Sequence, residues 1–226
     1  MSTHEPITDG ILRFRSELRL SPGTYLPIAA TAIRLPDGGV WLHSPIDFSD
    51  EDVAAIEALG PVKFIVAPSG LHHLFARAAA ARWPAATVVA SPAVATKQPG
   101  LAFLPLSATE RPWGDAIAAL PIDGMPDVQE WAFYHEPSRT LLVVDLLFHL
   151  LHTHGLGSYL TYTLVGTRGR LASSRLFRYF IKDAAAHWAS VDQVLAWPFD
   201  RLLPCHGEPI DSGAHPLVIE ALRVVR

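Results

Sequence analysis

Residues 62–75, VKFIVAPSGLHHLF, carry an apolar run into a pair of adjacent histidines. The run at 62–67 is short and rich in β-branched residues, which predicts a buried strand. A proline and a glycine end this strand, and apolar residues at helical spacing over 71–83 predict a helix after it. His72 and His73 therefore stand where a strand passes into a helix. Such a pair can hold a ligand, a metal ion above all, or can simply begin the helix.

Strands and helices alternate on both sides of this stretch. Alternating or fully apolar runs predict strands at 11–20, 29–44 (two strands joined by a turn at 36–39), 87–91, 116–122, 130–135, 140–145 and 201–205. Helical spacing and end signals predict helices at 50–60, 183–197 and 216–225, and residues 150–180 are expected to form loops with short helices. This order predicts one layered α/β domain over residues 1–226, with helices on the outer faces of mixed sheets.

Composition and charge restrict the class of protein. Half of the 226 residues are hydrophobic and 18% are charged, which is enough apolar material for a large folded core. The formal net charge is -4 and most basic residues are scattered, which disfavours a nucleic-acid partner. A thin basic cluster remains at Arg168, Arg170, Arg175 and Arg178. With one cysteine, no visible secretory signal and no membrane span, we expect a cytoplasmic protein that binds a small-molecule substrate or ligand, without a nucleic-acid or membrane partner.

Polar residues follow three of the predicted strands. His72 and His73 come after the first, Asp145 ends the second strand of a hairpin that turns at 136–138, and His206 follows the last strand in the sequence PCHGEP. A buried aspartate is costly unless it is paired or binds a metal, and the glycine after His206 allows a tight turn. Sites in α/β folds collect at the carboxyl ends of strands, so we expect these residues to lie together.

This series of residues resembles the metallo-β-lactamase superfamily, in which two similar halves form an αββα sandwich with a metal site at the sheet edges. There an apolar strand runs into an H-x-H-x-D-H motif and a helix. A later glycine-histidine pair precedes a hairpin, an aspartate closes its second strand, and a histidine-glycine pair comes near the end. Residues 62–91, 123–148 and 199–210 match these parts in order. The resemblance covers about residues 28–211 and is closest to an uncharacterised branch, a domain of unknown function. It implies the αββα fold and a metal-dependent hydrolase.

The match to the superfamily motif implies that one metal site is lost and another is kept. Pro68 and Gly70 fall on the first two histidines of the motif, and Met125 falls on the later one. None of these three side chains binds zinc or iron in the ordinary way. The second site would keep four ligands, which are His72 in place of a carboxylate, His73, Asp145 and His206.

This ligand set implies one divalent ion per chain, with zinc expected first and iron or manganese as alternatives. Both adjacent histidines can reach one ion only if His72 lies in the loop before the helix, because neighbouring helical residues point about 100° apart. Metal-bound water would then hydrolyse an ester, an amide or a phosphoester, with Asp145 and His43 as catalytic groups. His149 could assist in place of His43, and both histidines have the alternative of an ordinary core or loop role. Four closed ligands would instead make a structural site, on a non-catalytic ligand-binding or structural protein.

The remaining histidines and the cysteine have other expected roles. His149, His152 and His154 follow Asp145 closely, so we expect them beside the site or in a mobile lid over it. His135 is expected in a hairpin turn, away from the chemistry. Cys205 is expected to be a small buried residue.

Overall fold

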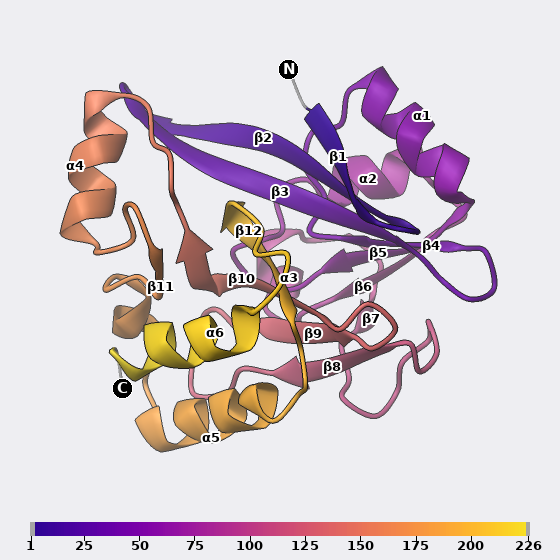
Figure 1. The fold of residues 1–226 in the computed structure, drawn as a ribbon. Coiled ribbons are helices and arrows are strands. Elements are labelled where there is room, and N and C mark those ends of the chain that lie inside the picture. Colours follow the sequence, from indigo (N-terminus) through magenta and orange to yellow (C-terminus); the bar gives the residue numbers. More distant parts are fainter. Residues whose placement is uncertain (1–2, 225–226) are drawn as a thin grey trace.

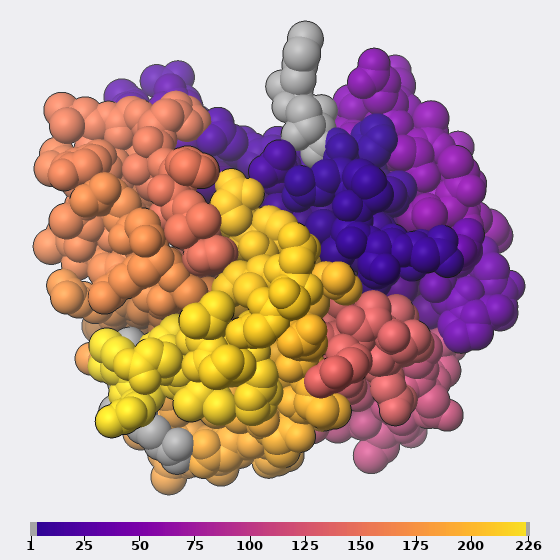
Figure 2. All heavy atoms as spheres, viewed as in Figure 1, coloured from indigo at the N-terminus to yellow at the C-terminus, as the bar shows by residue number. Residues whose placement is uncertain are grey.

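A computed structural model of the chain describes residues 3–224. Two β-sheets lie face to face, and helices cover their outer faces (Figure 1). The first half of the chain builds one sheet and its helices, and the second half builds the other. Figure 2 shows the two halves as neighbouring bodies, with indigo and purple residues over the upper right and orange and yellow residues over the left and bottom.

The first sheet follows the order of the chain. Its strands are β1 (Thr3–Thr8), β2 (Ile11–Ser21), β3 (Thr24–Arg34), β4 (Val40–His43), β5 (Val62–Ala67), β6 (Thr87–Ala90) and β7 (Leu104–Pro105). The first four strands are antiparallel, whereas β4 to β7 are parallel. Parallel neighbours need crossover connections, and two of these are the helices α1 (Asp50–Leu59) and α2 (Ala76–Arg82). A short helix, α3 (Val94–Lys97), follows β6.

The second sheet is smaller and is ordered differently. Its strands are β8 (Ile117–Pro121), β9 (Trp131–His135), β10 (Thr140–His149), β11 (Leu171–Ala172) and β12 (Arg201–Gly207). The order is β11-β10-β9-β8, and β12 pairs with β10 in parallel. The helices of this half are α4 (Leu156–Leu164), a 3-10 turn at Phe177–Phe180, α5 (Ala184–Leu195) and α6 (Ala214–Arg223). Within residues 3–224, every helix falls short of the length and hydropathy that a bilayer crossing requires.

Three apolar layers hold the sheets and helices together. The middle layer lies between the sheets, where Trp41 and Val66 of the first sheet meet Phe133 and Leu142 of the second. A second layer packs α1 and α2 on the first sheet, and a third packs α5 and α6 on the second. Burial of such surface, at about 25 cal/mol per Å², is the main favourable term in folding. The predicted αββα sandwich is confirmed.

The helix after β5 is shorter than the sequence predicts. Apolar spacing predicts a helix over 71–83, whereas α2 begins at Ala76 because residues 68–75 form turns. The Ser69 hydroxyl accepts hydrogen bonds from the backbone N–H groups of Leu71 and His72. A serine that satisfies these groups competes with the helix for them, so the chain turns here before it becomes helical.

Candidate metal centre

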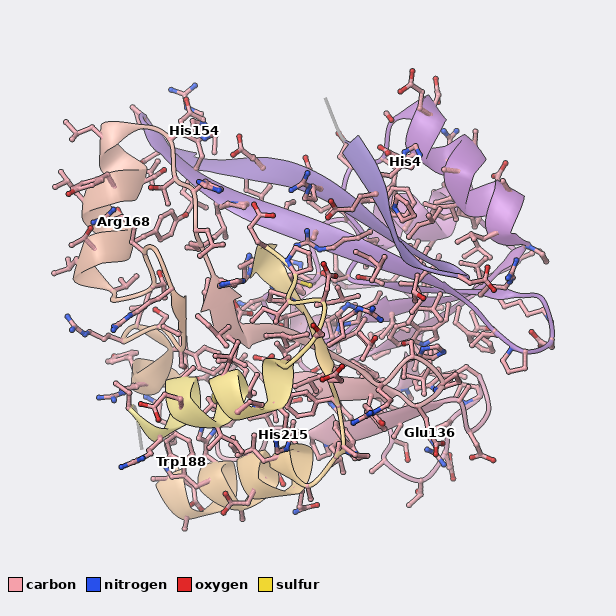
Figure 3. The ribbon with its side chains drawn as sticks, viewed as in Figure 1. His4, Glu136, His154, Arg168, Trp188 and His215 are labelled. Carbon is pink, nitrogen blue, oxygen red and sulfur yellow. The ribbon has the colours of Figure 1, made fainter. Side chains whose placement is uncertain are left out.

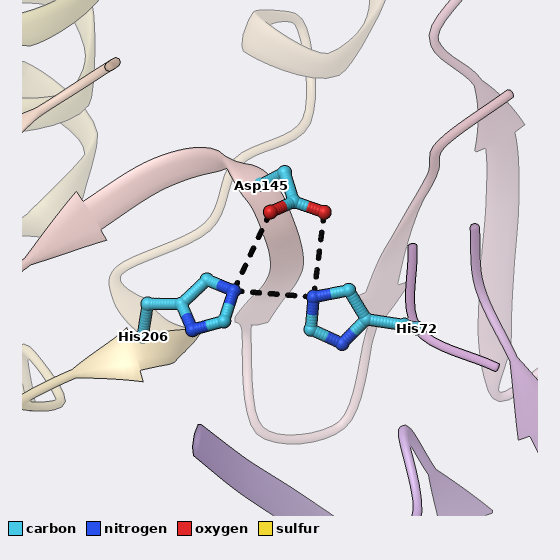
Figure 4. Close-up of side chains that lie close together, drawn as sticks. All are labelled: His72, Asp145 and His206. Atoms are coloured by element: carbon cyan, nitrogen blue, oxygen red, sulfur yellow. Dashed lines mark hydrogen bonds and ion pairs between the residues drawn. The ribbon is translucent and has the colours of Figure 1, made fainter. Parts of the chain in front are cut away.

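Three of the four predicted ligands converge at one edge of the sandwich (Figure 4). The Nε2 atoms of His72 and His206 are 3.1 Å apart. Asp145 lies against both rings, with Oδ2 3.3 Å from His72 Nε2 and Oδ1 3.4 Å from His206 Nε2. The three side chains come from β10, β12 and the loop after β5, so both sheets contribute to the cluster.

His72 stands in the loop before α2, which is the position that its convergence with the other groups requires. Its Nδ1 lies 2.8 Å from the hydroxyl oxygen of Ser44, the residue after β4. Because β4 and β5 are parallel neighbours, their carboxyl ends bring Ser44 and His72 to the same edge of the sheet. This contact holds the ring with Nε2 toward Asp145.

His206 is held from three sides. Its Nδ1 donates a hydrogen bond to the backbone oxygen of Pro27 at 2.8 Å, and its ring stacks on Phe148 with centroids 4.7 Å apart. The next residue, Gly207, has a φ of 98°, and a Cβ there would collide with the backbone of His149. Only glycine tolerates this conformation and this close approach. In the neutral ring, the Nε2 lone pair of His206 therefore faces the cluster.

Asp145 is turned toward the rings by an irregularity in β10. Between the pairs Val143–Pro204 and Phe148–His206, five residue steps along β10 face two steps along β12. Pro204 has no N–H for the ladder, so the pairing is interrupted where it stands. The extra residues of β10 form a bulge, and bulges re-aim side chains.

Glu130 stabilises this bulge from beneath. It is fully buried, and its Oε1 accepts hydrogen bonds from the backbone N–H groups of Val144 and Leu146, at 2.9 and 3.2 Å. These two N–H groups lie on either side of Asp145, and they donate to the Glu130 carboxyl oxygen instead of to a neighbouring strand. Burial, and then the nearby Asp145 carboxylate, raise the pKa of Glu130 to about 8, so it adds no charge beneath the site at neutral pH.

The electrostatics favour a neutral ring beside a charged carboxylate. Burial lowers the pKa of His72 below its ordinary value and outweighs the opposing effect of Asp145. Burial alone would raise the pKa of Asp145, yet the adjacent rings of His72 and His206 hold it below its usual range. The cluster therefore presents one negative charge and imidazole nitrogens to the same point, which suits a divalent cation.

The donor atoms also have the spacing of metal ligands. A tetrahedral ion with bonds of about 2.0–2.1 Å holds its ligand atoms about 3.3–3.4 Å apart. The two ring nitrogens, 3.1 Å apart, are close to that spacing. Asp145 offers a different oxygen to each ring, at 3.3 and 3.4 Å, and its ligand atom lies within 4.8 Å of both nitrogens. Metal-binding histidines usually have a hydrogen-bond partner on the other ring nitrogen, as His72 and His206 have here in Ser44 and Pro27. The residues present fit a divalent ion.

His73 lies outside the group that His72, Asp145 and His206 form. The side-chain amide of Gln98 lies 3.2 Å from His73 Nδ1 and donates to the His73 backbone oxygen at 3.1 Å. Consecutive residues point in different directions, so the turn that aims His72 inward aims His73 toward the end of α3. Among the described residues, the group that could hold an ion consists of His72, Asp145 and His206.

His43 lies in the core between the sheets. Its ring stacks on Trp41 with centroids 5.4 Å apart and packs against Phe133 at 5.3 Å. Burial lowers the pKa of His43 to about 3, so the ring stays neutral at physiological pH. The thiol of Cys205, itself buried, lies 4.0 Å from His43 Nδ1. These contacts describe a packed side chain, and the residue next to it, Ser44, is the one that touches the centre.

Backbone groups and apolar side chains contact Pro68, Gly70 and Met125, the three residues that the resemblance places at ligand positions. Gly70 donates a hydrogen bond to the Val128 oxygen at 2.7 Å, and a Cβ on Gly70 would come within 2.8 Å of a neighbouring side chain. The Pro68 oxygen accepts a hydrogen bond from the Trp131 N–H at 2.9 Å. Met125 is 2% exposed and packs in the core of the second half. Backbone hydrogen bonds thus join the loop of Pro68 and Gly70 to residues 128–131, whereas Met125 also lines a separate pocket of about 440 Å³.

The cluster forms the floor of a pocket of about 190 Å³. The walls come from β2 and β3, from the loop after β4 and from the loop that carries His72. Apart from the side chains of the cluster and Ser44, the lining is apolar.

The histidines that follow Asp145 lie around the outside of the centre. His149 is the last residue of β10, rather than one helical turn beyond Asp145, and its Nδ1 bonds to the Glu208 oxygen at 2.9 Å. His152 and His154 line a different pocket. His154 stacks on Tyr25 with centroids 4.5 Å apart.

The arginine cluster also lies elsewhere. Arg170, Arg175 and Arg178 line a separate pocket of about 250 Å³ beside β11, which shares no residue with the pocket over the metal centre. Arg168 packs on the ring of Tyr159 in α4 (Figure 3). His135, at the end of β9, lies 2.6 Å from the hydroxyl of Ser138 in the hairpin turn.

A family model described as a domain of unknown function, DUF4336, matches residues 14–154. This segment is more than half of the chain. The chain belongs to the DUF4336 family. The segment shared with the family includes two residues of the centre, His72 and Asp145, whereas His206 lies beyond it. The comparison with curated proteins gave no match.

Solved structures share the fold at low sequence identity. A metallo-β-lactamase from Pontibacter korlensis superposes with a TM-score of 0.67 at 13% identity, covering 100% of this chain and 99% of that one. The metallo-β-lactamase FIM-1 from Pseudomonas aeruginosa, solved in its mono-zinc form, superposes with a TM-score of 0.63 at 14% identity. That alignment covers 99% of this chain and 96% of that one. A metal-soaked flavodiiron core from Synechocystis sp. PCC6803 gives 0.65 at 14%, covering 98% of this chain and 60% of that one. The DUF4336 chain therefore has the metallo-β-lactamase fold.

Two residues that support the centre were not found from the sequence. Ser44 directly follows His43, for which a catalytic role was expected, and its positive φ of 50° lies in the turn after β4. Glu130 precedes an apolar strand, and a carboxylate beside a run that must be buried was a usable signal. Its partners are backbone groups of β10, which carry no trace in the sequence.

Proposed function

We propose that this protein is a metal-dependent hydrolase that holds one divalent ion, zinc first, on His72, Asp145 and His206. The observation that carries the proposal is that His72, Asp145 and His206 each offer a ligand atom within 4.8 Å of the others, beside a pocket that all three line. Catalytic zinc sites have three protein ligands and keep a fourth position open, whereas structural sites have four. Because His73 lies apart, the ligand count supports the catalytic type.

A divalent ion at this point would polarise a substrate carbonyl and lower the pKa of a water molecule. The chain's own groups do the rest. His72 and His206 are oriented through Ser44 and Pro27, which spares reorganisation when substrate binds. Asp145 directs one oxygen to each ring, so the same carboxylate holds both rings at the centre.

The replacement of three superfamily ligands supports a single ion. Pro68, Gly70 and Met125 offer no donor for zinc, and a Cβ at Gly70 would be crowded by a neighbouring side chain. A lone ion keeps water activation but lacks the second cation that clamps the other reacting oxygen. Loss of such a transition-state contact costs on the order of 10²–10³ in rate, so we expect slow or narrow hydrolysis of an ester or amide rather than efficient β-lactam cleavage.

The test compares metal-loaded protein with two adjacent histidine variants. Protein stripped of metal and reloaded with zinc, manganese or iron is assayed on nitrophenyl esters, anilides, a chromogenic β-lactam and a phosphodiester, and its metal content is measured. In His72→Ala the hydrolytic activity is expected to fall by a factor of at least about 100, and the protein is expected to lose the ion. His73→Ala is the matched control and is expected to keep both. A protein that holds one ion but is inactive on the whole panel would favour a non-catalytic ligand-binding protein.

A further inference from the structure

Apart from Ser44, the walls of the pocket beside the candidate metal centre are apolar. Leu18 and Leu26 face each other across β2 and β3, and Ile28 lies further along β3. Ile46 contributes from the loop after β4. The walls therefore come from segments that lie far apart in the sequence, and they bound one small space together with the cluster.

The mouth of the pocket exposes further apolar side chains. Leu71 and Leu74 flank His72 and line the pocket, yet they are 39% and 54% exposed, and Phe75 beside them is half-buried. Large apolar side chains held at the rim of a cavity mark ligand sites more often than isolated ones do. An apolar ligand would cover these side chains and remove their surface from water.

Charge narrows the chemistry of that ligand. Asp145 is the one residue in the pocket lining that carries a fixed charge, and a divalent ion beside it leaves a net charge of about +1 with neutral rings. A phosphoryl transition state spreads charge over three oxygens and needs more cationic partners than this. A carbonyl group develops a single negative charge, which this floor can balance.

The volume of the pocket limits the size of the ligand. A pocket of about 190 Å³ is close in size to a cavity of about 150 Å³ that holds a benzene molecule. A straight chain of about six carbon atoms, or a benzene-sized ring, would fill it.

We infer that the pocket binds the uncharged, apolar acyl group of an ester, thioester or amide, about six non-hydrogen atoms long, with its carbonyl at the metal centre. This inference rests on the proposed function for the position of the carbonyl. The binding of the apolar group depends only on the pocket, so the two parts can be tested separately.

The first experiment uses straight-chain hydroxamic acids from acetyl to decanoyl, because the hydroxamate group binds a metal ion and the chain samples the pocket. Titration calorimetry on the zinc-loaded protein is expected to show affinity that rises two- to fourfold per methylene and levels near six carbon atoms. A fully buried methylene corresponds to about fourfold. Equal affinity for all chain lengths would overturn the inference while leaving the metal site in place.

A charged variant at the rim supplies the second arm. Leu74→Asp is expected to weaken hexanoyl hydroxamate about tenfold and to leave acetohydroxamate unchanged. Leu217→Asp on α6 is the matched control, because Leu217 is 50% exposed and lies away from the pocket; its whole series should stay at wild-type affinity. A chain-length dependence that is the same in Leu74→Asp and wild type would also overturn the inference.

The third arm removes the metal. Saturation-transfer NMR with 1-hexanol on metal-free protein is expected to show binding that Leu74→Asp reduces and Leu217→Asp does not. If hydroxamates fail to bind but hexanol behaves in this way, the proposed metal function is wrong and the apolar pocket is supported. If hexanol shows no transfer to any variant, the pocket is not a binding site for apolar groups.

Discussion

Replacement of His206 by alanine is expected to remove most of the stabilisation that zinc gives to this protein. His206 supplies one of three donor atoms, and its bond to the Pro27 oxygen holds Nε2 3.1 Å from that of His72. The donors come from segments 72, 145 and 206, so the unfolded chain does not hold them together. An ion that binds only the native state stabilises it by mass action.

The magnitude follows from this linkage. At free zinc 100 times above the Kd, the stabilisation is about 2.7 kcal/mol. A chain of 226 residues shifts its Tm by about 2–4 °C per kcal/mol, so zinc is expected to raise the Tm by about 5–10 °C. Loss of one ligand in three is expected to weaken binding at least about 100-fold. At the same zinc concentration, the stabilisation by zinc that remains in the variant is then about 0.4 kcal/mol, which corresponds to a Tm shift of about 1 °C.

The assay is a thermal melt with and without zinc at a fixed, buffered free concentration. His149→Ala is the matched control, because His149 makes a similar bond from Nδ1 to a backbone oxygen, 2.9 Å from Glu208, but lies outside the cluster. It is expected to keep the zinc shift of wild type even if its metal-free Tm falls. A zinc shift in His206→Ala equal to that of wild type would refute the assignment of His206 as a ligand.

Three further predictions concern the neighbours of the centre and one distant histidine. Ser44→Ala removes the partner of His72 Nδ1 and is expected to lower zinc affinity about 10- to 100-fold, measured by competition with a chromophoric chelator; unchanged affinity would show that the bond does not orient the ring. His73→Ala is expected to leave zinc affinity within about twofold in the same assay, since His73 contacts Gln98 instead; a large loss would restore it as a ligand. Burial lowers the pKa of His135 to about 4 from 6.5, so its contribution is present above pH 6.5 and is lost as the pH falls toward 4. Urea melts should show that the free energy of unfolding of wild type falls between pH 7 and pH 5 by about 2 kcal/mol more than that of His135→Gln. An equal fall in both proteins would contradict the neutral buried ring.

Much of the fold could be predicted because its information is local. The apolar run at 62–67, the capped helix after Ser49 and the hairpin at 136–138 all appear in the structure, with boundaries moved by a few residues. The middle of the chain from 150 to 180 was less regular in sequence, and there α4 and β11 are short elements whose packing partners lie elsewhere in the chain.

For the candidate site as well, part of the information is local to the sequence. The sequence by itself determined which side chains exist at each strand end: histidine at 72 and 206, aspartate at 145, and residues without a zinc donor at 68, 70 and 125. Residue identity alone decides whether a donor atom is available, so the absence of ligands at those three positions needed no coordinates.

Only the tertiary structure decided which available donors meet. Hydrogen bonds to Ser69 delay α2 and turn His72, rather than His73, toward the second sheet. Glu130 holds the bulge that aims Asp145, through backbone groups that any sequence would possess. The pocket likewise exists because β2 and β3 pass over an edge built by strands more than a hundred residues away. Sequence periodicity reports the face of a local element on which a side chain lies, whereas convergence depends on pairings between distant segments, and no local pattern records these.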